Sequence, residues 1–397
     1  MLLSLALVFL CGMTLGSVFQ KLKLPRLLGM LLTGILLGPY VLNLLDPSIL
    51  NISTDLRQIA LIIILARAGL NLDINELKRV GRPAILMCFV PACFEILGTL
   101  ILAPMLLGIS RLEAAILGTV IAAVSPAVIV PKMLKLMESG YGKRKSIPQM
   151  IMAGASVDDV FVIVLFTAFT GLEKGTGITP IHFLTIPTSI VFGLIGGVIA
   201  GLLLALLFSK AHIRDSSKVV IILSVSFLLV TVEHSLKGAI GFSGLLAVMA
   251  MGATLQQRKH AVSKRLSEKF SKLWVCAEVL LFVLVGATVN ISYAFNAGLT
   301  AVVLICCVLL LRMVGVFACL IKTSLNKKER VFSALAYLPK ATVQAAIGGL
   351  PLAMGFACGD IVLTVAVLSI LITAPLGAIL VDATYQKLLD KEDLEGV

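Results

Sequence analysis

The stretch IPQMIMAGASVDDVFVIVLFTAFTG, residues 147–171, places two adjacent aspartates, Asp158 and Asp159, near the middle of a long apolar segment. About 20 apolar residues in a helix cross a hydrocarbon core of about 30 Å, so this segment is long enough to span a membrane. A charged aspartate at the centre of a bilayer costs roughly 2.5–3.5 kcal/mol on insertion scales. Because no structural need in lipid calls for two consecutive carboxylates, the pair predicts a site that binds cations or protons.

The composition of the whole chain, and not only of this stretch, is that of a membrane protein. Of its 397 residues, 59% are hydrophobic and 14% are charged, whereas an ordinary soluble domain has about 25% charged residues. The mean hydropathy is +1.07. We predict an all-α polytopic membrane protein with about 13 transmembrane helices. The predicted spans are 2–19, 27–45, 56–73, 83–107, 113–134, 147–171, 186–209, 218–233, 238–256, 273–293, 297–321, 331–354 and 361–384.

The basic residues alternate between the predicted loops. Most of the 33 Lys and Arg fall in loops that follow odd-numbered spans or in the short tail, 385–397. By the positive-inside rule these loops face the cytoplasm, so the N-terminus lies outside and the C-terminus is cytoplasmic. The first segment, 2–19, has no basic residue before it, which predicts a spanning helix and not a signal peptide. The net charge of +12 therefore belongs to loops at a lipid surface and does not indicate nucleic-acid binding.

Thirteen spans can divide into two six-helix halves of inverted topology joined by a linker helix. The fifth and twelfth spans would then match, and proline interrupts both near the middle, at Pro126 and Pro339. Proline removes a backbone donor and breaks the helical ladder. Interrupted helices at matching positions of inverted halves favour a transporter's binding site. If the breaks cross, Asp158 offsets the positive helix ends and Lys340 the negative ends; an ordinary proline kink is the alternative for each break alone.

Five ionisable residues fall near the midpoints of their predicted spans, which predicts a single polar site; they are Glu95, Asp158, Asp159, Arg312 and Lys340. A buried carboxylate holds a proton more readily than an exposed one, so the aspartate pair can hold either a proton or a small cation. A helix cap or structural salt bridge is the alternative for that pair. Glu95 and Arg312 are predicted to form a structural ion pair, with a direct part in ion binding or proton coupling as the alternative.

Two further charged residues lie within spans without a decided role. Arg67 is interpreted as an anchor that reaches the membrane surface from near the end of its span. Glu278 either lines a cytoplasmic funnel or pairs with a loop lysine. The eight cysteines lie almost entirely in apolar segments without a CxxC motif, so we predict no disulfide, resident metal or cofactor.

Competition between a proton and a cation for one site is the minimum chemistry of an exchanger, so we predict a secondary transporter and not an enzyme. An intramembrane aspartyl protease also needs two buried aspartates, but it places them on different helices, one in a GxGD motif that this chain lacks. Matched broken helices at a closed midplane site favour alternating access over a passive channel. Exchange of K⁺ for H⁺ and sodium-coupled symport of a solute remain alternatives.

Five stretches together carry a resemblance to a known family. They are RAGLNLD (67–73), AAVSPAVIVPKML (122–134), GYGKRKSIPQMIMAGASVDDV (140–160), LFVLVGATVN (281–290) and LPKATVQAAIG (338–348). The chain resembles the monovalent cation/proton antiporter superfamily, and most of all the NHA-type sodium/proton exchangers of the exchanger domain-containing branch with their bacterial homologues. The resemblance covers essentially the whole chain.

The resemblance implies antiport of Na⁺, and also Li⁺, against H⁺ by a homodimer in the cell membrane. Asp159 is then the residue that alternately binds cation and proton, and Asp158 is the neighbour that helps to coordinate the cation. Ser125 and Thr342 would add oxygen ligands at the two crossing breaks, which contain Pro126 and Lys340. A moving core would comprise 83–171 and 297–384; the rest of 1–107, together with 218–293, would form a dimerisation scaffold.

One departure from that family concerns stoichiometry. Many electrogenic relatives carry a lysine where this chain has Arg312, and a lysine can lose its proton during the cycle whereas an arginine cannot. With Glu95 as a permanent partner for Arg312, we expect electroneutral exchange of one cation for one proton.

Overall fold

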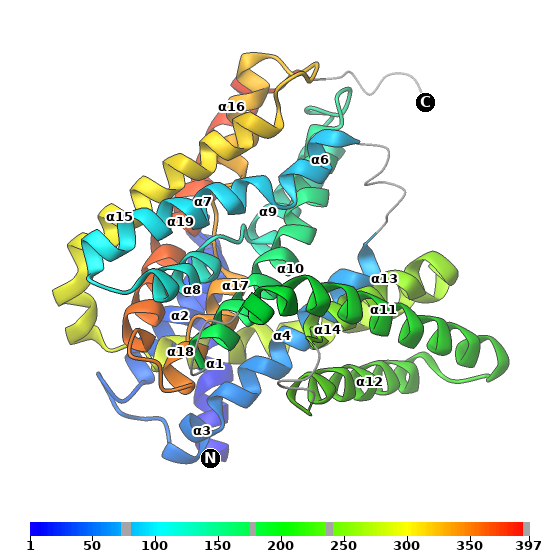
Figure 1. Ribbon diagram of the computed structural model, residues 1–397, viewed down its shortest axis with the longest axis horizontal. Helices are drawn as coiled ribbons and strands as arrows, with labels where there is room; N and C mark the ends of the chain where they lie inside the picture. Colours follow the sequence, from blue (N-terminus) through cyan, green and yellow to red (C-terminus); the bar gives the residue numbers. More distant parts are fainter. Residues whose placement is uncertain (73–80, 175–179, 236–240, 392–397) are drawn as a thin grey trace. The chain divides into compact units, whose positions relative to one another are not determined.

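The structure of the protein is a computed structural model, which describes residues 1–72, 81–174, 180–235 and 241–391 (Figure 1). Within these ranges the regular structure is helical, apart from an isolated antiparallel bridge between Tyr141 and Lys391. Nine helical segments of the described chain are long and apolar enough to cross a membrane. The predicted all-α class of a multi-pass membrane protein is therefore confirmed.

Each of the thirteen predicted spans overlaps a helix, but several bounds differ from the prediction. The predicted span 27–45 ends early, because Gly38 and Pro39 follow the helix and the residue before a proline disfavours helical geometry. The helix that contains most of the predicted span 273–293 begins earlier, at His260, since its first turns are rich in charged residues that hydropathy does not mark. The number of crossings and the inverted repeat stay predictions.

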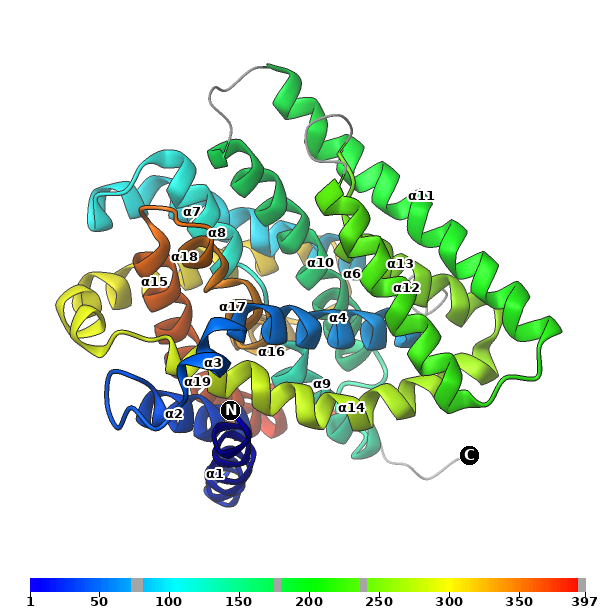
Figure 2. The same ribbon diagram turned by 90° about the horizontal axis from the view of Figure 1, so that it is seen from below.

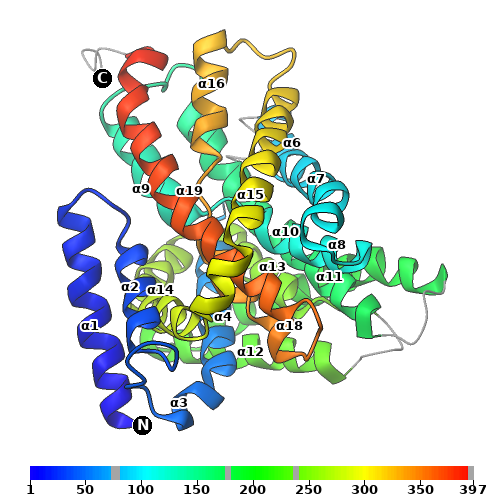
Figure 3. The same cartoon turned by 90° about the vertical axis from the view of Figure 1, so that its left-hand side faces the viewer.

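The described chain forms two compact units, of which the first comprises Met1–Thr54, Glu76–Val162 and Leu281–Val397. Its helices are α1 (Leu2–Lys21), α2 (Arg26–Leu37), α3 (Pro47–Asn51), α6 (Arg82–Met87), α7 (Val90–Leu107), α8 (Arg111–Ile121), α9 (Pro126–Glu138), the first part of α10 (Ile147–Lys174), α15 (Ile291–Cys319), α16 (Lys327–Ala336), α17 (Thr342–Ile347), α18 (Leu350–Ala353) and α19 (Gly359–Leu388). In this unit α1 packs along α2, α7 packs against α8 and α15, and α16 packs on α19 (Figure 3).

The second unit comprises Asp55–Asn75 and Ile163–Leu280. Its helices are α4 (Ser53–Asn71), α11 (Pro180–Lys210), α12 (Asp215–Ser235), α13 (Gly244–Arg258), most of α14 (His260–Ala287) and the end of α10. Here α13 packs along both α11 and α12 (Figure 2). Helix α4 crosses α13 so closely that a Cβ on Gly69 would collide with the carbonyl oxygen of Met249, a close approach typical of helices in membranes.

Two helix interruptions in the first unit position the candidate site. Helix α8 ends at Ile121 and α9 begins at Pro126, where proline at the first helical position has no N–H to leave unpaired. Helix α16 ends at Ala336, and the chain stays non-helical until α17 begins at Thr342. The backbone N–H of Ser125 donates to the carbonyl oxygen of Pro339 at 2.8 Å. The two breaks thus contact each other directly.

Candidate functional site

The first break exposes backbone groups that charged side chains from other helices satisfy. Ile121 is the last residue of α8, and its carbonyl accepts from Lys340 Nζ; the carbonyl of Ala122 accepts from Arg312 Nη1. The backbone N–H of Val124 donates to Asp158 Oδ2 at 2.9 Å. Cations therefore lie at the carbonyl end of one half-helix and a carboxylate lies before the amide end of the next, which offsets the partial charges of both ends.

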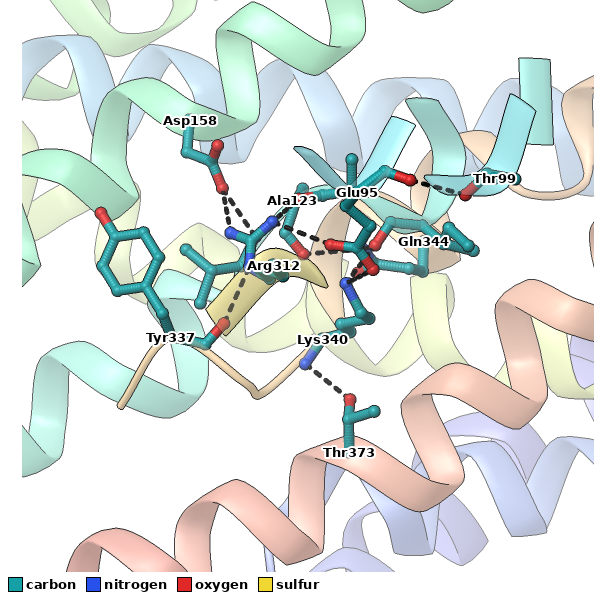
Figure 4. Close-up of polar contacts among 12 residues, drawn as sticks. Glu95, Thr99, Ala123, Asp158, Arg312, Tyr337, Lys340, Gln344 and Thr373 are labelled. Atoms are coloured by element: carbon teal, nitrogen blue, oxygen red, sulfur yellow. Dashed lines mark hydrogen bonds and ion pairs between the residues drawn. The ribbon is translucent and has the colours of Figure 1, made fainter. Parts of the chain in front are cut away.

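Arg312, on α15, is fully buried and joins both breaks (Figure 4). Its Nη2 donates to Asp158 Oδ2 at 2.8 Å, and its Nη1 donates to Glu95 Oε2 at 3.0 Å. Its Nε donates to the carbonyl of Tyr337 at 2.9 Å, and the guanidinium lies 5.4 Å from the centre of the Tyr337 ring. A guanidinium suits this place because its planar fork carries five donors and stays charged.

Lys340 extends the same network from the second break. Its Nζ lies 2.7 Å from Glu95 Oε1, so Glu95 pairs with two cations through its two oxygens (Figure 4). The backbone N–H of Lys340 donates to Thr373 Oγ1 at 2.9 Å, which ties the break to α19. Glu95 and Lys340 are both at most 1% exposed. The ion pair between Glu95 and Arg312 is thus one edge of a larger network.

The network is a chain of alternating charges, Asp158–Arg312–Glu95–Lys340, in which two carboxylates and two cations cancel formally. Asp159 stands outside it. This carboxylate is 8% exposed, and among the described residues it makes no ion pair. Its Oδ1 is buried without a hydrogen-bond partner. Of the two adjacent aspartates, Asp158 is held by an arginine and a backbone amide, whereas Asp159 is left without such partners.

Further oxygens near the breaks also lack partners within the described chain. They are Ser125 Oγ, Thr342 Oγ1, Asp158 Oδ1 and Gln344 Oε1. Ser125 is the N-cap residue of α9, yet its hydroxyl makes no capping bond. A buried polar atom without a partner costs free energy, and oxygen atoms of this kind are the ligands that hard cations prefer. These carboxylate, hydroxyl and amide oxygens are therefore the groups that could hold a dehydrated cation.

Several residues of this site escaped the sequence analysis. Tyr337 lies at the start of the second break, where its carbonyl accepts from Arg312, and Thr373 accepts from the backbone N–H of Lys340. Nothing in the apolar segments around these two residues indicates those contacts. Gln344 donates from Nε2 to the carbonyl of Ala123 at 2.9 Å. A signal for it existed, because a glutamine inside the apolar stretch LPKATVQAAIG is itself unusual for a membrane helix.

The second unit contains the two charges whose role was undecided. Arg67 on α4 and Glu278 on α14 interact electrostatically. The cytoplasmic funnel and the pairing with a loop lysine both stay hypotheses for Glu278. Arg67 is half-buried, and its role as an anchor that reaches the membrane surface stays a prediction.

An all-helical fold with spanning helices, two touching helix breaks and a buried charge network at them defines the class of integral membrane ion transporters. The chain belongs to the transmembrane sodium/hydrogen exchanger family, which matches residues 5–386. It is 35% identical to sodium/hydrogen exchanger 9B2 of Mus musculus, over 99% of this chain and 74% of that protein. Sodium/hydrogen exchanger 9B1 of Homo sapiens is 31% identical, over 98% of this chain and 78% of that protein.

The fold is also that of a solved antiporter. The structure of the sodium proton antiporter MjNhaP1 from Methanocaldococcus jannaschii at pH 8 superposes with a TM-score of 0.85. The alignment covers 97% of each chain at 22% identity. The resemblance to the monovalent cation/proton antiporter superfamily is therefore confirmed for the family and for the fold.

Proposed function

We propose that this protein exchanges Na⁺ for H⁺ across a membrane, with the two ions competing for Asp159. The observation that carries the proposal is the charge balance of the site, in which Asp159 is the carboxylate outside a neutral four-charge network. A proton or a cation can each neutralise it, but not both together. The Na⁺ assignment is supported by the names of the relatives, which are sodium/hydrogen exchangers.

Asp158, Ser125 and Thr342 complete the proposed cation site. Each has a buried oxygen without a hydrogen-bond partner in the described chain. Oxygen ligands of one carboxylate pair and two hydroxyls suit a small hard cation such as Na⁺ or Li⁺. Pro126 and Lys340 belong to the crossing that places these oxygens, and the cation is cargo, not a resident cofactor.

The transport cycle we propose is electroneutral alternating access. Arg312 keeps its proton throughout, because a guanidinium does not deprotonate in proteins, and both neighbouring carboxylates hold it. One proton then replaces one cation at Asp159. The core, 83–171 and 297–384, would move against a scaffold made of the rest of 1–107 and of 218–293, within a homodimer.

The membrane arrangement we propose has thirteen spans in two inverted halves, with the N-terminus outside and the tail, 385–397, in the cytoplasm of a cell-membrane protein surrounded by lipid. The alternating basic loops support this orientation. The end of the tail, 392–397, lies outside the described residues.

Exchange in proteoliposomes tests the proposal. A pH-sensitive dye inside the vesicles should report proton movement when Na⁺ or Li⁺ is added, and a much weaker signal with K⁺. Asp159→Asn should abolish the signal, because an amide binds neither a proton nor a cation in this way. Asp360→Asn, which makes the same chemical change at an exposed aspartate of α19, should leave the rate unchanged.

Three outcomes would contradict the proposal. A normal rate in Asp159→Asn would show that the carrier is elsewhere, and exchange with K⁺ alone would point to a different cation. A steady current during exchange across a supported membrane would exclude electroneutral stoichiometry.

A further inference from the structure

We propose that Gln344 is a positioning residue that fixes the geometry of the α8–α9 break and thereby sets the discrimination between Na⁺ and Li⁺. This inference rests on the proposed exchange function. Gln344 lies on α17 and is 1% exposed. It belongs to the second break's helix, yet its side chain reaches the first break (Figure 4).

The amide of Gln344 binds two carbonyls of the first break. Nε2 donates to the carbonyl of Ala123 at 2.9 Å and lies 3.5 Å from that of Ile121. Both neighbours are acceptors, so the amide has one sensible orientation, with nitrogen toward the carbonyls and oxygen away from them. That orientation leaves Oε1 buried without a partner.

Gln344 completes the set of groups that hold the break. Arg312 binds the carbonyl of Ala122, and Asp158 accepts from the N–H of Val124. The carbonyl of Ala123 lies between those two groups in the chain, and Gln344 is the side chain that binds it. Without this bond, a buried carbonyl next to the proposed cation site would lose its partner.

The position of this carbonyl bears on the cation site through the chain itself. Val124, whose amide fixes Asp158, and Ser125, whose hydroxyl is a proposed ligand, follow Ala123 directly. A shift of the Ala123 peptide therefore moves a carboxylate and a hydroxyl of the site together. Na⁺ and Li⁺ differ in radius and so respond differently to such a shift. Gln344 thus acts on the cation through the backbone and without touching it.

The test compares Gln344→Met and Gln344→Glu with Gln149→Ala in full-length protein reconstituted into liposomes. Methionine keeps most of the volume but has no N–H donor, whereas glutamate keeps the shape and replaces the donor with an acceptor. Gln149 is a matched control, since it is a glutamine of the same unit whose amide oxygen also lacks a partner within the described chain. We measure apparent KM and maximal rate for Na⁺ and for Li⁺, together with thermal unfolding.

Loss of one hydrogen bond predicts a rise of about threefold to tenfold in the apparent KM for Na⁺ in Gln344→Met. The ratio of the two KM values should change, while Gln149→Ala keeps both. Gln344→Glu should regain part of the wild-type KM ratio at acidic pH, since a protonated carboxyl can again donate to the carbonyl of Ala123. A purely structural role would not produce this recovery.

Unchanged KM values, or an equal loss of maximal rate for both cations without a change in their KM ratio, would overturn the inference. If Gln344→Met does not fold, the pH profile of Gln344→Glu decides the question. The two proposals can fail separately. If the wild-type protein exchanges no ions, the proposed function is refuted. If the wild type is active, Asp159→Asn is inactive and Gln344→Met has wild-type KM values, only this inference is refuted.

Discussion

Neutralising Asp158 should lower the stability of the protein, whereas neutralising Asp159 should leave it unchanged or raise it. Asp158 Oδ2 accepts from Arg312 at 2.8 Å and from the N–H of Val124 at 2.9 Å. Asp159 has no ion pair within the described chain. Asp158→Asn therefore removes a partner from a buried cation, whereas Asp159→Asn removes a buried carboxylate that makes no ion pair within the described residues.

The expected magnitudes follow from these contacts. Removing one partner of a buried ion pair costs about 3–5 kcal/mol. Arg312 keeps Glu95 and two carbonyls, and an asparagine still offers one acceptor oxygen, so we expect about 3 kcal/mol for Asp158→Asn. In a chain of this size that is a fall of roughly 3–6 °C in the unfolding midpoint. Asp159→Asn should leave the midpoint unchanged or raise it, because an isolated buried charge is costly.

Thermal unfolding of detergent-purified protein in Na⁺-free buffer measures both changes. Adding Na⁺ gives a second measurement: a bound ligand stabilises the folded state, so wild type should gain stability with Na⁺ and Asp159→Asn should not. The control is Asp360→Asn, which should stay within about 1 kcal/mol of wild type because that aspartate is exposed. Equal shifts of the same sign in the Asp158 and Asp159 variants would refute the division of roles.

Three more predictions address the network, the packing and the competition. Glu95→Gln should lower the free energy of unfolding by about 3–5 kcal/mol, because it leaves the buried Lys340 ammonium without its carboxylate. Adding Lys340→Met removes that ammonium and should recover about 1–3 kcal/mol in a double-mutant cycle. Additive losses in the double variant would contradict this. Gly154→Ala should lower both the unfolding midpoint and the yield of folded protein, because its Cβ would collide with the Tyr337 hydroxyl; a wild-type midpoint would contradict it. In liposomes, the apparent KM for Na⁺ should rise by about tenfold per pH unit at acidic pH if one proton competes with one cation, and a KM independent of pH would exclude a shared site.

The helices and their interruptions could be read from the sequence because both depend on local chemistry. Runs of apolar residues set the spans, and proline fixes where α9 begins. Hydropathy does not mark the charged first turns of α14, so this helix begins thirteen residues before the predicted span 273–293. It also misses the early end of α2, where the turn at Gly38 and Pro39 overrides an apolar continuation.

The sequence could predict which charged residues belong to the site, but not which of them contact one another. A common depth brought Glu95, Arg312 and Lys340 together on sequence alone, since lipid makes every buried charge conspicuous. Which oxygen faces which nitrogen depends on contacts between residues far apart in the chain, such as Lys340 and Ile121, which are 219 positions apart. Thr373 shows the limit most clearly. Threonine is common in membrane helices, and only the fold reveals that this one binds the second break.

The contacts of Arg312 bear on the number of protons exchanged for each cation. If Arg312 bound only Glu95, this ion pair could break and re-form during each transport cycle. Arg312 could then move whenever the charge of Asp158 changed. In the observed network, Arg312 also binds carbonyls of both breaks, so releasing it would unpair Ala122 and Tyr337 as well as Glu95 and Asp158. Each such loss leaves a buried polar or charged group without a partner. The total free-energy cost would exceed the free energy gained from one contact with the cation. A site built in this way keeps its arginine in place and leaves the change of charge to Asp159.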